Sequence, residues 1–419
     1  MRAVRLLPPR FGAAALLALA AAAALTACGK SSIHTRSAGA GGGGGGGTAP
    51  TLASVAAQGA VSLVTKNTAR LGGADPASDA AAVARAVYPA LTPATRPQVV
   101  VVVDQRNWGA SLAASVLAGA QLRAPLLFSE GGSLPEVSGA ALEAMRPAGS
   151  AAVGGAQVIE LGTTAALPGG LRSRTVTVPA DEAAAAVAVE RLLEAAHGAR
   201  PRRVIVVASD APRALQMPAA GLAAESGAPI LFTRSSGLPA TTRAVLARLR
   251  RPSIYLVGSG GIATGALREL ARFGPVTPVA ATSAAAAPVE NAIAVARFTD
   301  GAFGWGVKEP GHGLVFANAG RPLDAPAAAP LSASGQYGPL LLLESAHAVP
   351  PALATYLSDI QPAYGHAPQY QPVHGAYNHG WLIGDEGAIS AATQAELDAM
   401  LEIVPAKASS EEAPIPAPE

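Results

Sequence analysis

The stretch Ala124-Pro125-Leu126-Leu127-Phe128 decides the fold, because the chain contains it three times. It returns as Ala228-Pro229-Ile230-Leu231-Phe232 and, with changes, as Gly338-Pro339-Leu340-Leu341-Leu342. The residue before a proline is pushed towards extended geometry, and proline is tolerated as the first residue of a strand. The apolar residues that follow therefore predict a short buried strand at each of the three places.

A second proline follows each of these predicted strands. Pro135 and Pro239 lie ten residues after the first proline of their stretch, and Pro350 lies eleven residues after its own. Proline suits the first turn of a helix. One unit of strand, loop and helix is therefore predicted three times.

The composition indicates what the core is made of. Half of the 419 residues are hydrophobic, but only 4% are aromatic, so the core must consist of Ala, Val, Leu and Ile. Such residues favour close-packed helices on thin parallel sheets, whose strands are unbroken apolar runs. The length is sufficient for two or three domains.

The amino terminus has the pattern of an export signal. Arg2, Arg5 and Arg10 precede an apolar run from residue 11 to residue 25, and Leu25-Thr26-Ala27-Cys28 follows. This segment resembles a bacterial lipoprotein signal peptide with its lipobox, which implies diacylation of Cys28 and cleavage before it. The alternative is an uncleaved membrane helix, but a spanning helix needs about 20 apolar residues.

Cysteine content and charge narrow the classes of function. Cys28 is the only cysteine, so the body has no disulfide, cysteine nucleophile or thiolate metal site. After cleavage, 27 basic residues face 28 acidic ones, a net formal charge of −1. The overall charge therefore does not favour nucleic acid as a partner.

The body repeats with a constant offset of 104 residues between its first two copies, from Ala124 to Ala228, Pro135 to Pro239 and Val153 to Val257. Strands and helices alternate in each copy, which predicts an α/β protein with parallel sheets and right-handed crossovers. The predicted first helices are 77–88, 181–196 and 289–298; the long strands are 99–103, 204–207 and 314–317; the closing strands, each ending in a glycine turn, are 152–155, 255–258 and 381–384.

Segments without apolar periodicity flank the repeats. The run of glycines from Gly41 to Gly47 predicts a flexible tether, and the Pro- and Glu-containing end predicts a disordered tail. The predicted organisation is a signal peptide at 1–27, a tether at 28–59, copies at 60–168, 169–276 and 277–404, and a tail at 405–419.

The repeat resembles the bacterial cell-wall-binding repeat type 2 family over residues 60–404. The matching motifs are Arg70-Leu71-Gly72-Gly73-Ala74-Asp75, Ser133-Leu134-Pro135 and Ala388-Ile389-Ser390. The resemblance implies three tandem Rossmann/flavodoxin-like units with small parallel sheets, arranged as a pseudo-threefold ring. It also implies binding of an anionic cell-wall polysaccharide or teichoic-acid-like polymer.

The chain departs from the family pattern in three ways. Copies two and three lack the opening Arg-x-Gly-Gly in recognisable form. Pro76-Ala77-Ser78-Asp79-Ala80 replaces the usual Arg-Tyr-x-Thr-Ala start of the first helix, and Asp324 alone matches the aspartate of the Pro-Asp-Ala-Leu turn. Ligand details of the family therefore carry over less securely than its fold.

One arginine follows the long strand of each copy: Arg106, Arg213 and Arg321. Ligands of open parallel sheets bind beyond the carboxyl ends of the strands, and guanidinium groups pair with phosphate and carboxylate. Three equivalent arginines would gain affinity for a repetitive polymer through multivalency. The alternative is that all three are ordinary solvated loop residues.

The third copy contains an insertion at 361–380. It is rich in tyrosine and histidine, which suit carbohydrate stacking, metal ligation or a loop packed by its own aromatic rings. The spacings do not match a compact zinc motif, and all three alternatives stay open. The residues concerned are Tyr364, His366, Tyr370, His374, Tyr377 and His379.

Nucleotide and enzyme functions have little support. The glycine turns at Gly154-Gly155 and Gly258-Ser259-Gly260-Gly261 close each unit, whereas a dinucleotide fingerprint follows the first strand. Ser111 and Ser129 are possible nucleophiles, but neither Gly-x-Ser-x-Gly nor His-Glu-x-x-His occurs. We expect no catalytic residues, metal or cofactor.

The sequence thus predicts a non-enzymatic lipoprotein of the cell envelope, anchored in the membrane by lipid on Cys28 and bound to an anionic wall polymer. The alternatives are a solute-binding lipoprotein of an import system and a protein-interaction scaffold. The predicted polymer-binding residues are Arg70, Arg106, Arg213, Arg321, Asp324, Tyr370 and His374.

Overall fold

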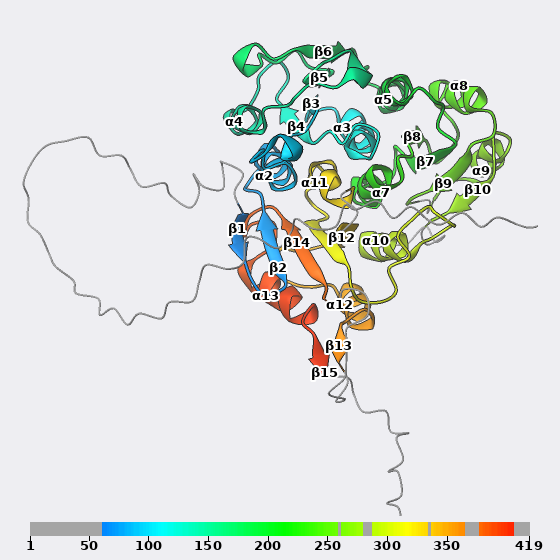
Figure 1. Cartoon of the computed structure of the whole chain (residues 1–419). Coiled ribbons are helices and arrows are strands. Elements are labelled where there is room, and N and C mark those ends of the chain that lie inside the picture. Colours follow the sequence, from blue (N-terminus) through cyan, green and yellow to red (C-terminus); the bar gives the residue numbers. More distant parts are fainter. Residues whose placement is uncertain (1–60, 259–260, 280–286, 334–336, 365–376, 406–419) are drawn as a thin grey trace, which may run out of the picture. The chain divides into compact units, whose positions relative to one another are not determined.

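The computed structural model describes residues 61–258, 261–279, 287–333, 337–364 and 377–405. These residues form three sheets of four or five mostly parallel strands and one two-stranded parallel sheet, connected by helices (Figure 1). The mixed α/β class with small parallel sheets is therefore confirmed. Cys28 and the predicted signal peptide, tether and tail lie outside the described residues, apart from Pro405.

The first two sheets have the same strand order. Their central strands, β3 and β7, each have the next strand of the chain on one side and the strand after that on the other. The orders are β4-β3-β5-β6 and β8-β7-β9-β10. The strands are β3 (Val100–Asp104), β4 (Leu126–Ser129), β5 (Val158–Leu161), β6 (Ser173–Val176), β7 (Arg203–Ala208), β8 (Ile230–Thr233), β9 (Ser253–Leu256) and β10 (Val276–Pro278).

The third sheet repeats this order with a strand taken from the start of the described chain. Its order is β12-β11-β14-β2-β1, and only the β1–β2 pair is antiparallel. Each copy's first strand thus pairs with the last strand of another copy: β6 with β5, β10 with β9, and β2 with β14. The strands are β1 (Val61–Val64), β2 (Thr68–Leu71), β11 (Gly313–Asn318), β12 (Tyr337–Leu343) and β14 (His379–Ile383), and a separate pair joins β13 (Ala363–Tyr364) to β15 (Val404–Pro405).

Helices connect the strands, and within the described ranges none of them is both long and apolar enough to span a bilayer. The α-helices are α2 (Pro76–Val87), α3 (Trp108–Ala114), α4 (Glu136–Met145), α5 (Glu182–His197), α6 (Arg213–Gln216), α7 (Pro218–Ser226), α8 (Ala240–Leu249), α9 (Thr264–Ala271), α10 (Pro288–Arg297), α11 (Asp324–Ser332), α12 (Pro351–Asp359) and α13 (Ala391–Met400). The 3-10 helices are η1 (Pro93–Thr95), η2 (Ser115–Ala118), η3 (Ala151–Val153) and η4 (Pro168–Gly170).

The thrice-repeated stretch forms the predicted strands β4, β8 and β12. The second proline, however, precedes the helix instead of lying in its first turn: Pro135, Pro239 and Pro350 are the N-cap residues of α4, α8 and α12. Each keeps an extended ψ near 145°, and its carbonyl accepts the first helical hydrogen bond, for example from the Gly139 N–H at 3.0 Å. Proline fits this position because its ring fixes φ near −65° and the cap donates no hydrogen bond.

The predicted closing strand of the first copy is wrong. Residues 151–153 form the 3-10 helix η3, and strand β5 lies further on, at Val158–Leu161. The apolar pair Ala152-Val153 followed by two glycines is a tight turn, closed by the bridge between Ser150 and Ala156. The 104-residue offset therefore ends before this strand, and the closing glycine of the first copy is Gly162. The closing strands predicted near 255 and 381 are confirmed as β9 and β14.

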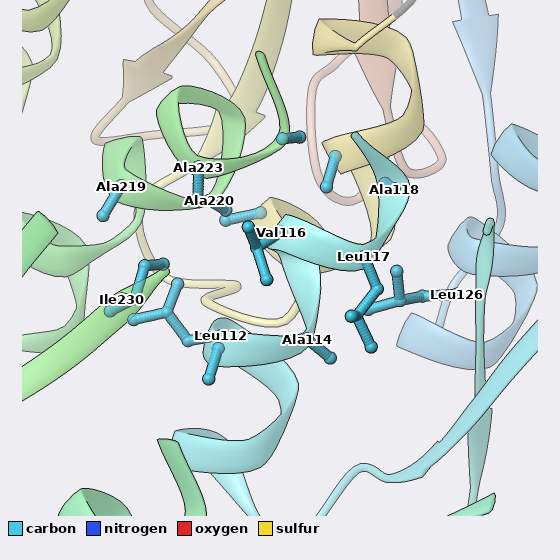
Figure 2. Close-up of a cluster of buried hydrophobic side chains, with 14 of the residues drawn as sticks. Leu112, Ala114, Val116, Leu117, Ala118, Leu126, Ala219, Ala220, Ala223 and Ile230 are labelled. Carbon is cyan, nitrogen blue, oxygen red and sulfur yellow. The ribbon is translucent and has the colours of Figure 1, made fainter. Parts of the chain in front are cut away.

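The helices that follow the central strands pack against one another in the core. Val116 of η2 and Leu112 of α3 lie towards the alanines of α7, whereas Leu117 of η2 lies beside Leu126 of β4, as Figure 2 shows. Helix α11 contacts both α7 and η2. A side chain at Gly221 in α7 would lie 2.7 Å from Ser332 Oγ, so small residues are needed for this close approach. The alanine-rich composition thus lets three equivalent helices meet.

Candidate functional site

A cleft lies at the carboxyl ends of strands β3, β5 and β6. The strand order reverses between β3 and β5, and ligands of doubly wound α/β sheets bind at such a point. The cleft has a volume of about 340 Å³. We call it the first-sheet cleft; its polar lining consists of Asp104, Arg106, Thr163, Thr164, Thr175 and Thr177.

The cation of this cleft is Arg106, which the sequence analysis had singled out. Its Nε donates to Asp104 Oδ1 at 3.1 Å and its Nη2 donates to Asp104 Oδ2 at 2.8 Å. The Arg106 side chain is 70% exposed, whereas that of Asp104 is 12% exposed. One side of the guanidinium is thus held by the protein, and the other faces solvent.

The carboxylate of Asp104 positions this arginine. Burial raises the pKa of Asp104, but hydrogen bonds from Arg106 and from the Gly131 N–H outweigh burial, so the pKa lies below its ordinary value. Asp104 is therefore ionised at neutral pH. Gly131 has φ 63°, and a side chain there would lie 2.4 Å from Arg106 Nη2, so glycine is needed to bring the turn against the guanidinium.

Hydroxyl groups also line this cleft. Thr164, Thr175 and Thr177 are exposed, while the buried Thr163 donates to the Gly131 carbonyl at 2.5 Å. A guanidinium beside several hydroxyls can bind an anionic group and the neighbouring hydroxyls of a sugar. The sequence analysis missed these threonines, although Thr175-Val176-Thr177 at the end of a strand was a usable signal.

The second copy has a different arrangement at the same place. Asp210 accepts hydrogen bonds from the Ser235 N–H at 2.8 Å and the Ser235 hydroxyl at 2.5 Å. A cavity of about 400 Å³ lies beside it, lined by Asp181, Glu182 and Arg234 among others. Arg213 is exposed, and its guanidinium lies 5.5 Å from the ring centroid of Trp108, on the first copy.

In the third copy the equivalent arginine, Arg321, binds carboxylates inside the protein. Arg321 Nη2 donates to Asp79 Oδ2 at 2.5 Å and its Nε donates to Asp324 Oδ2 at 2.9 Å; both carboxylates are fully buried. The Arg321 side chain is only 23% exposed. Burial raises the pKa of Asp79 to about 6 in spite of Arg321, and burial together with Asp79 raises that of Asp324. Asp324, predicted to contact polymer, has no accessible surface.

Arg70 is also internal. It is 2% exposed, and its guanidinium donates to Gln394 Oε1 and to the carbonyls of Gly384, Asp385 and Ile389 at 2.6 to 3.1 Å. These bonds attach β2 to the loop and helix that follow β14. The side chain has no surface to offer a polymer, so its role is structural.

The aromatic insertion is described only at its ends. Tyr370 and His374 lie outside the described residues. Tyr377 is 64% exposed, and the ring of His379 packs edge-on against that of Trp381, with 4.8 Å between centroids. Across the described residues, no three His, Cys, Asp or Glu side chains gather as metal ligands do.

Solved structures share this fold. The cell wall protein Cwp6 from Clostridium difficile matches with a TM-score of 0.60 and 16% identity, over 81% of this chain and 49% of Cwp6. Cwp8 from the same organism matches with a TM-score of 0.58 and 17% identity, over 81% of this chain and 53% of Cwp8. The chain thus spans about half the length of these proteins, and at such identities the likeness shows a common fold. No family model and no curated protein matches the chain.

Proposed function

We propose that this chain is a cell-envelope protein that binds an anionic cell-wall polymer and is anchored in the membrane by lipid on Cys28. The observation that carries the proposal is the fold, because two cell wall proteins share it over 81% of the chain. The proposed role is attachment or positioning at the wall, without catalysis or a cofactor. The three copies form a pseudo-threefold ring in this proposal, which the pairing of β2 with β14 supports.

The first-sheet cleft supports the chemical part of the proposal. Arg106 presents guanidinium donors to solvent, and hydroxyls of Thr164, Thr175 and Thr177 stand beside it. Phosphate or carboxylate groups of a wall polymer would pair with the arginine, and its sugar or polyol hydroxyls with the threonines. Each such contact is weak, and a polymer that repeats the group gains affinity by rebinding.

Co-sedimentation with purified wall tests the proposed function. The full chain carrying Cys28→Ser, which cannot be lipidated, is mixed with wall before and after removal of its secondary polymers. We expect sedimentation only with the complete wall. Equal recovery in the supernatant with both preparations would refute wall binding.

Substitution of the exposed arginines tests the residues. Arg106→Glu with Arg213→Glu should weaken sedimentation with the wall while the unfolding midpoint stays within a few degrees of that of the unmodified chain. Arg321 is left unchanged, because its loss would leave the buried carboxylates of Asp79 and Asp324 without a cation. Unchanged sedimentation would remove both exposed arginines from the site.

A further inference from the structure

The three copies differ greatly in formal charge. Residues 60–168 contain seven basic and seven acidic residues, residues 169–276 contain 14 and seven, and residues 277–404 contain three and 11. With histidine neutral, the net charges are 0, +7 and −8. The near neutrality of the whole chain therefore hides one strongly basic and one strongly acidic copy.

Many of the second copy's arginines lie at one edge of its sheet, where strands β7, β9 and β10 begin. The loops before these strands are adjacent: the Ser253 N–H donates to the Arg202 carbonyl at 2.9 Å, and the Ile254 N–H donates to the Pro275 carbonyl at 2.8 Å. We call this surface the arginine edge. It consists of Arg200, Arg202, Arg203, Arg250, Arg251 and Arg272.

Most of these cations form no ion pair. Arg202, Arg250, Arg251 and Arg272 are exposed, and among the described residues none of the four has a carboxylate within 4 Å, although Arg272 is near enough to Glu269 for a charge interaction. Arg200 lies 3.5 Å from Glu194, and the Arg203 guanidinium lies 5.9 Å from the Phe303 ring centroid. The three loops contain no acidic residue. Clustered like charges repel, so an anion from outside would stabilise this edge.

The backbone at this edge also departs from the usual pattern. Arg250 and Arg251 follow α8 with φ of 57° and 65°, a left-handed conformation that costs non-glycine residues about 1 kcal/mol or more each. Helices α5 and α7 end in this conformation with Gly198 and Gly227, whereas α4, the equivalent of α8 in the first copy, ends with Arg146 in it. A helix dipole favours one cation at a C-terminus, which accounts for Arg250 but not for Arg202 or Arg251.

A cavity beside the arginine edge could receive part of a ligand. It has a volume of about 340 Å³, and its lining includes Arg200, Arg202 and Arg203 together with His197. Neighbouring strands are about 4.8 Å apart, so the three loops that carry these arginines stand in a row. Such a row matches a chain molecule whose anionic groups repeat, because each guanidinium can pair with one of them.

We propose that the arginine edge is the principal surface on which the chain binds a linear wall polymer that carries repeated phosphate or carboxylate groups. This proposal rests on the wall-polymer function and locates it in the second copy. The acidic third copy repels the same polymer, so the three copies do not contribute equally. The first-sheet cleft then contributes a secondary contact through Arg106.

Two matched variants of the full Cys28→Ser chain test this inference. The edge variant is R202Q/R250Q/R251Q, and the control variant is R174Q/R191Q/R268Q, which removes three exposed arginines elsewhere between residues 169 and 276. The ligands are linear inorganic polyphosphate and purified wall, at 50 and 150 mM salt, and thermal unfolding checks that both variants fold.

We expect the edge variant to bind both ligands at least tenfold more weakly, and the control variant to bind within threefold of the unmodified chain. The affinity of the edge variant should also depend less on salt than that of the unmodified chain, because the variant forms fewer ion pairs for salt to screen. Equal affinities of the two variants would overturn the inference. If the unmodified chain sediments with wall and the edge variant does so equally, the inference fails while the proposed function stands.

If the unmodified chain does not sediment with wall, the proposed function itself fails. Binding to vesicles that contain phosphatidylglycerol is the last measurement, made on the unmodified chain and on both variants. Vesicle binding that needs the arginine edge, with wall binding unchanged in the edge variant, would assign the surface to the membrane and overturn the polymer as its ligand.

Discussion

Arg106 and Arg321 follow equivalent central strands, yet one faces solvent and the other is buried in the protein. Arg106 pairs with one carboxylate and is 70% exposed; Arg321 pairs with two fully buried carboxylates and is 23% exposed. An arginine at the same place in the fold is thus open to a ligand in the first copy and stabilises the protein in the third.

The different exposure of Arg106 and Arg321 comes from the residues at two neighbouring positions. Three residues after the arginine stands Asp324 in the third copy and Gly109 in the first. The fourth residue of the helix that follows the fourth strand of the order, β2 or β6, is Asp79 for the third sheet and Ala185 for the first. Only the third sheet therefore supplies two acids that hold its arginine inside. Charge at these two positions decides whether the arginine is available.

The largest expected effect is on stability. Arg321→Ala leaves the carboxylates of Asp79 and Asp324 buried without a cation and should lower the free energy of unfolding by about 3 kcal/mol or more at pH 7. Arg106→Ala is the matched control and should cost much less, because the Arg106 side chain is exposed. Urea unfolding of both variants measures this. Equal losses would mean that the two arginines are equivalent after all.

The pH dependence of stability tests the same carboxylates. The pKa of Asp79 is about 6 in the folded protein, above the ordinary value of 3.8, so the folded state holds a proton that the unfolded state releases. This group's contribution to stability is full below pH 4 and is lost as the pH rises through 6. Relative to Asp79→Asn, the unmodified chain should lose about 2 kcal/mol between pH 4 and pH 7. A difference between the two chains that stays constant with pH would contradict this.

A smaller effect is expected at the turn that supports Arg106. Gly131→Ala places a methyl group 2.4 Å from Arg106 Nη2 at a φ of 63°, so it should cost about 1 kcal/mol of stability and displace the guanidinium. Gly132→Ala is its control, because nothing lies within 4 Å of the added methyl group. Unfolding and wall sedimentation are measured for both. The comparison fails if both substitutions have the same effect.

The smallest effect is expected from the hydroxyls of the first-sheet cleft. Thr175→Val with Thr177→Val should leave the free energy of unfolding within about 0.5 kcal/mol, because both residues are exposed. Affinity for the wall should fall about threefold, the value of a modest hydrogen bond. Unaltered affinity would exclude these hydroxyls from polymer binding.

The repeated Ala-Pro stretch predicted the class of fold and most strands correctly. It did so because proline and runs of Val, Leu and Ile restrict the backbone locally. The closing strand of the first copy was misplaced, since Ala152-Val153-Gly154-Gly155 resembles a strand end but forms a turn, and the actual strand begins six residues after Ala152, at Val158. The unequal charges of the copies were readable in the sequence and were missed because only the total was considered.

The candidate site was predicted only in part. The position of Arg106 followed from the rule that ligands bind beyond strand ends, and the structure places it on a cleft. The burial of Arg70 and Arg321 could not be predicted, because their partners Gln394 and Asp79 lie 324 and 242 residues away in the chain. Such pairs depend on which copy's helix comes to lie beside which sheet.

The sequence by itself determined the local units, because proline geometry and apolar runs act over a few residues. It also determined the charge of each copy. Only the tertiary structure decided that β2 joins the sheet of β14, and hence that Arg70 and Asp79 meet residues from the other end of the chain. The physical reason is that an edge strand has unpaired backbone groups, and any parallel strand of matching register can satisfy them. Which strand does so depends on how the copies pack.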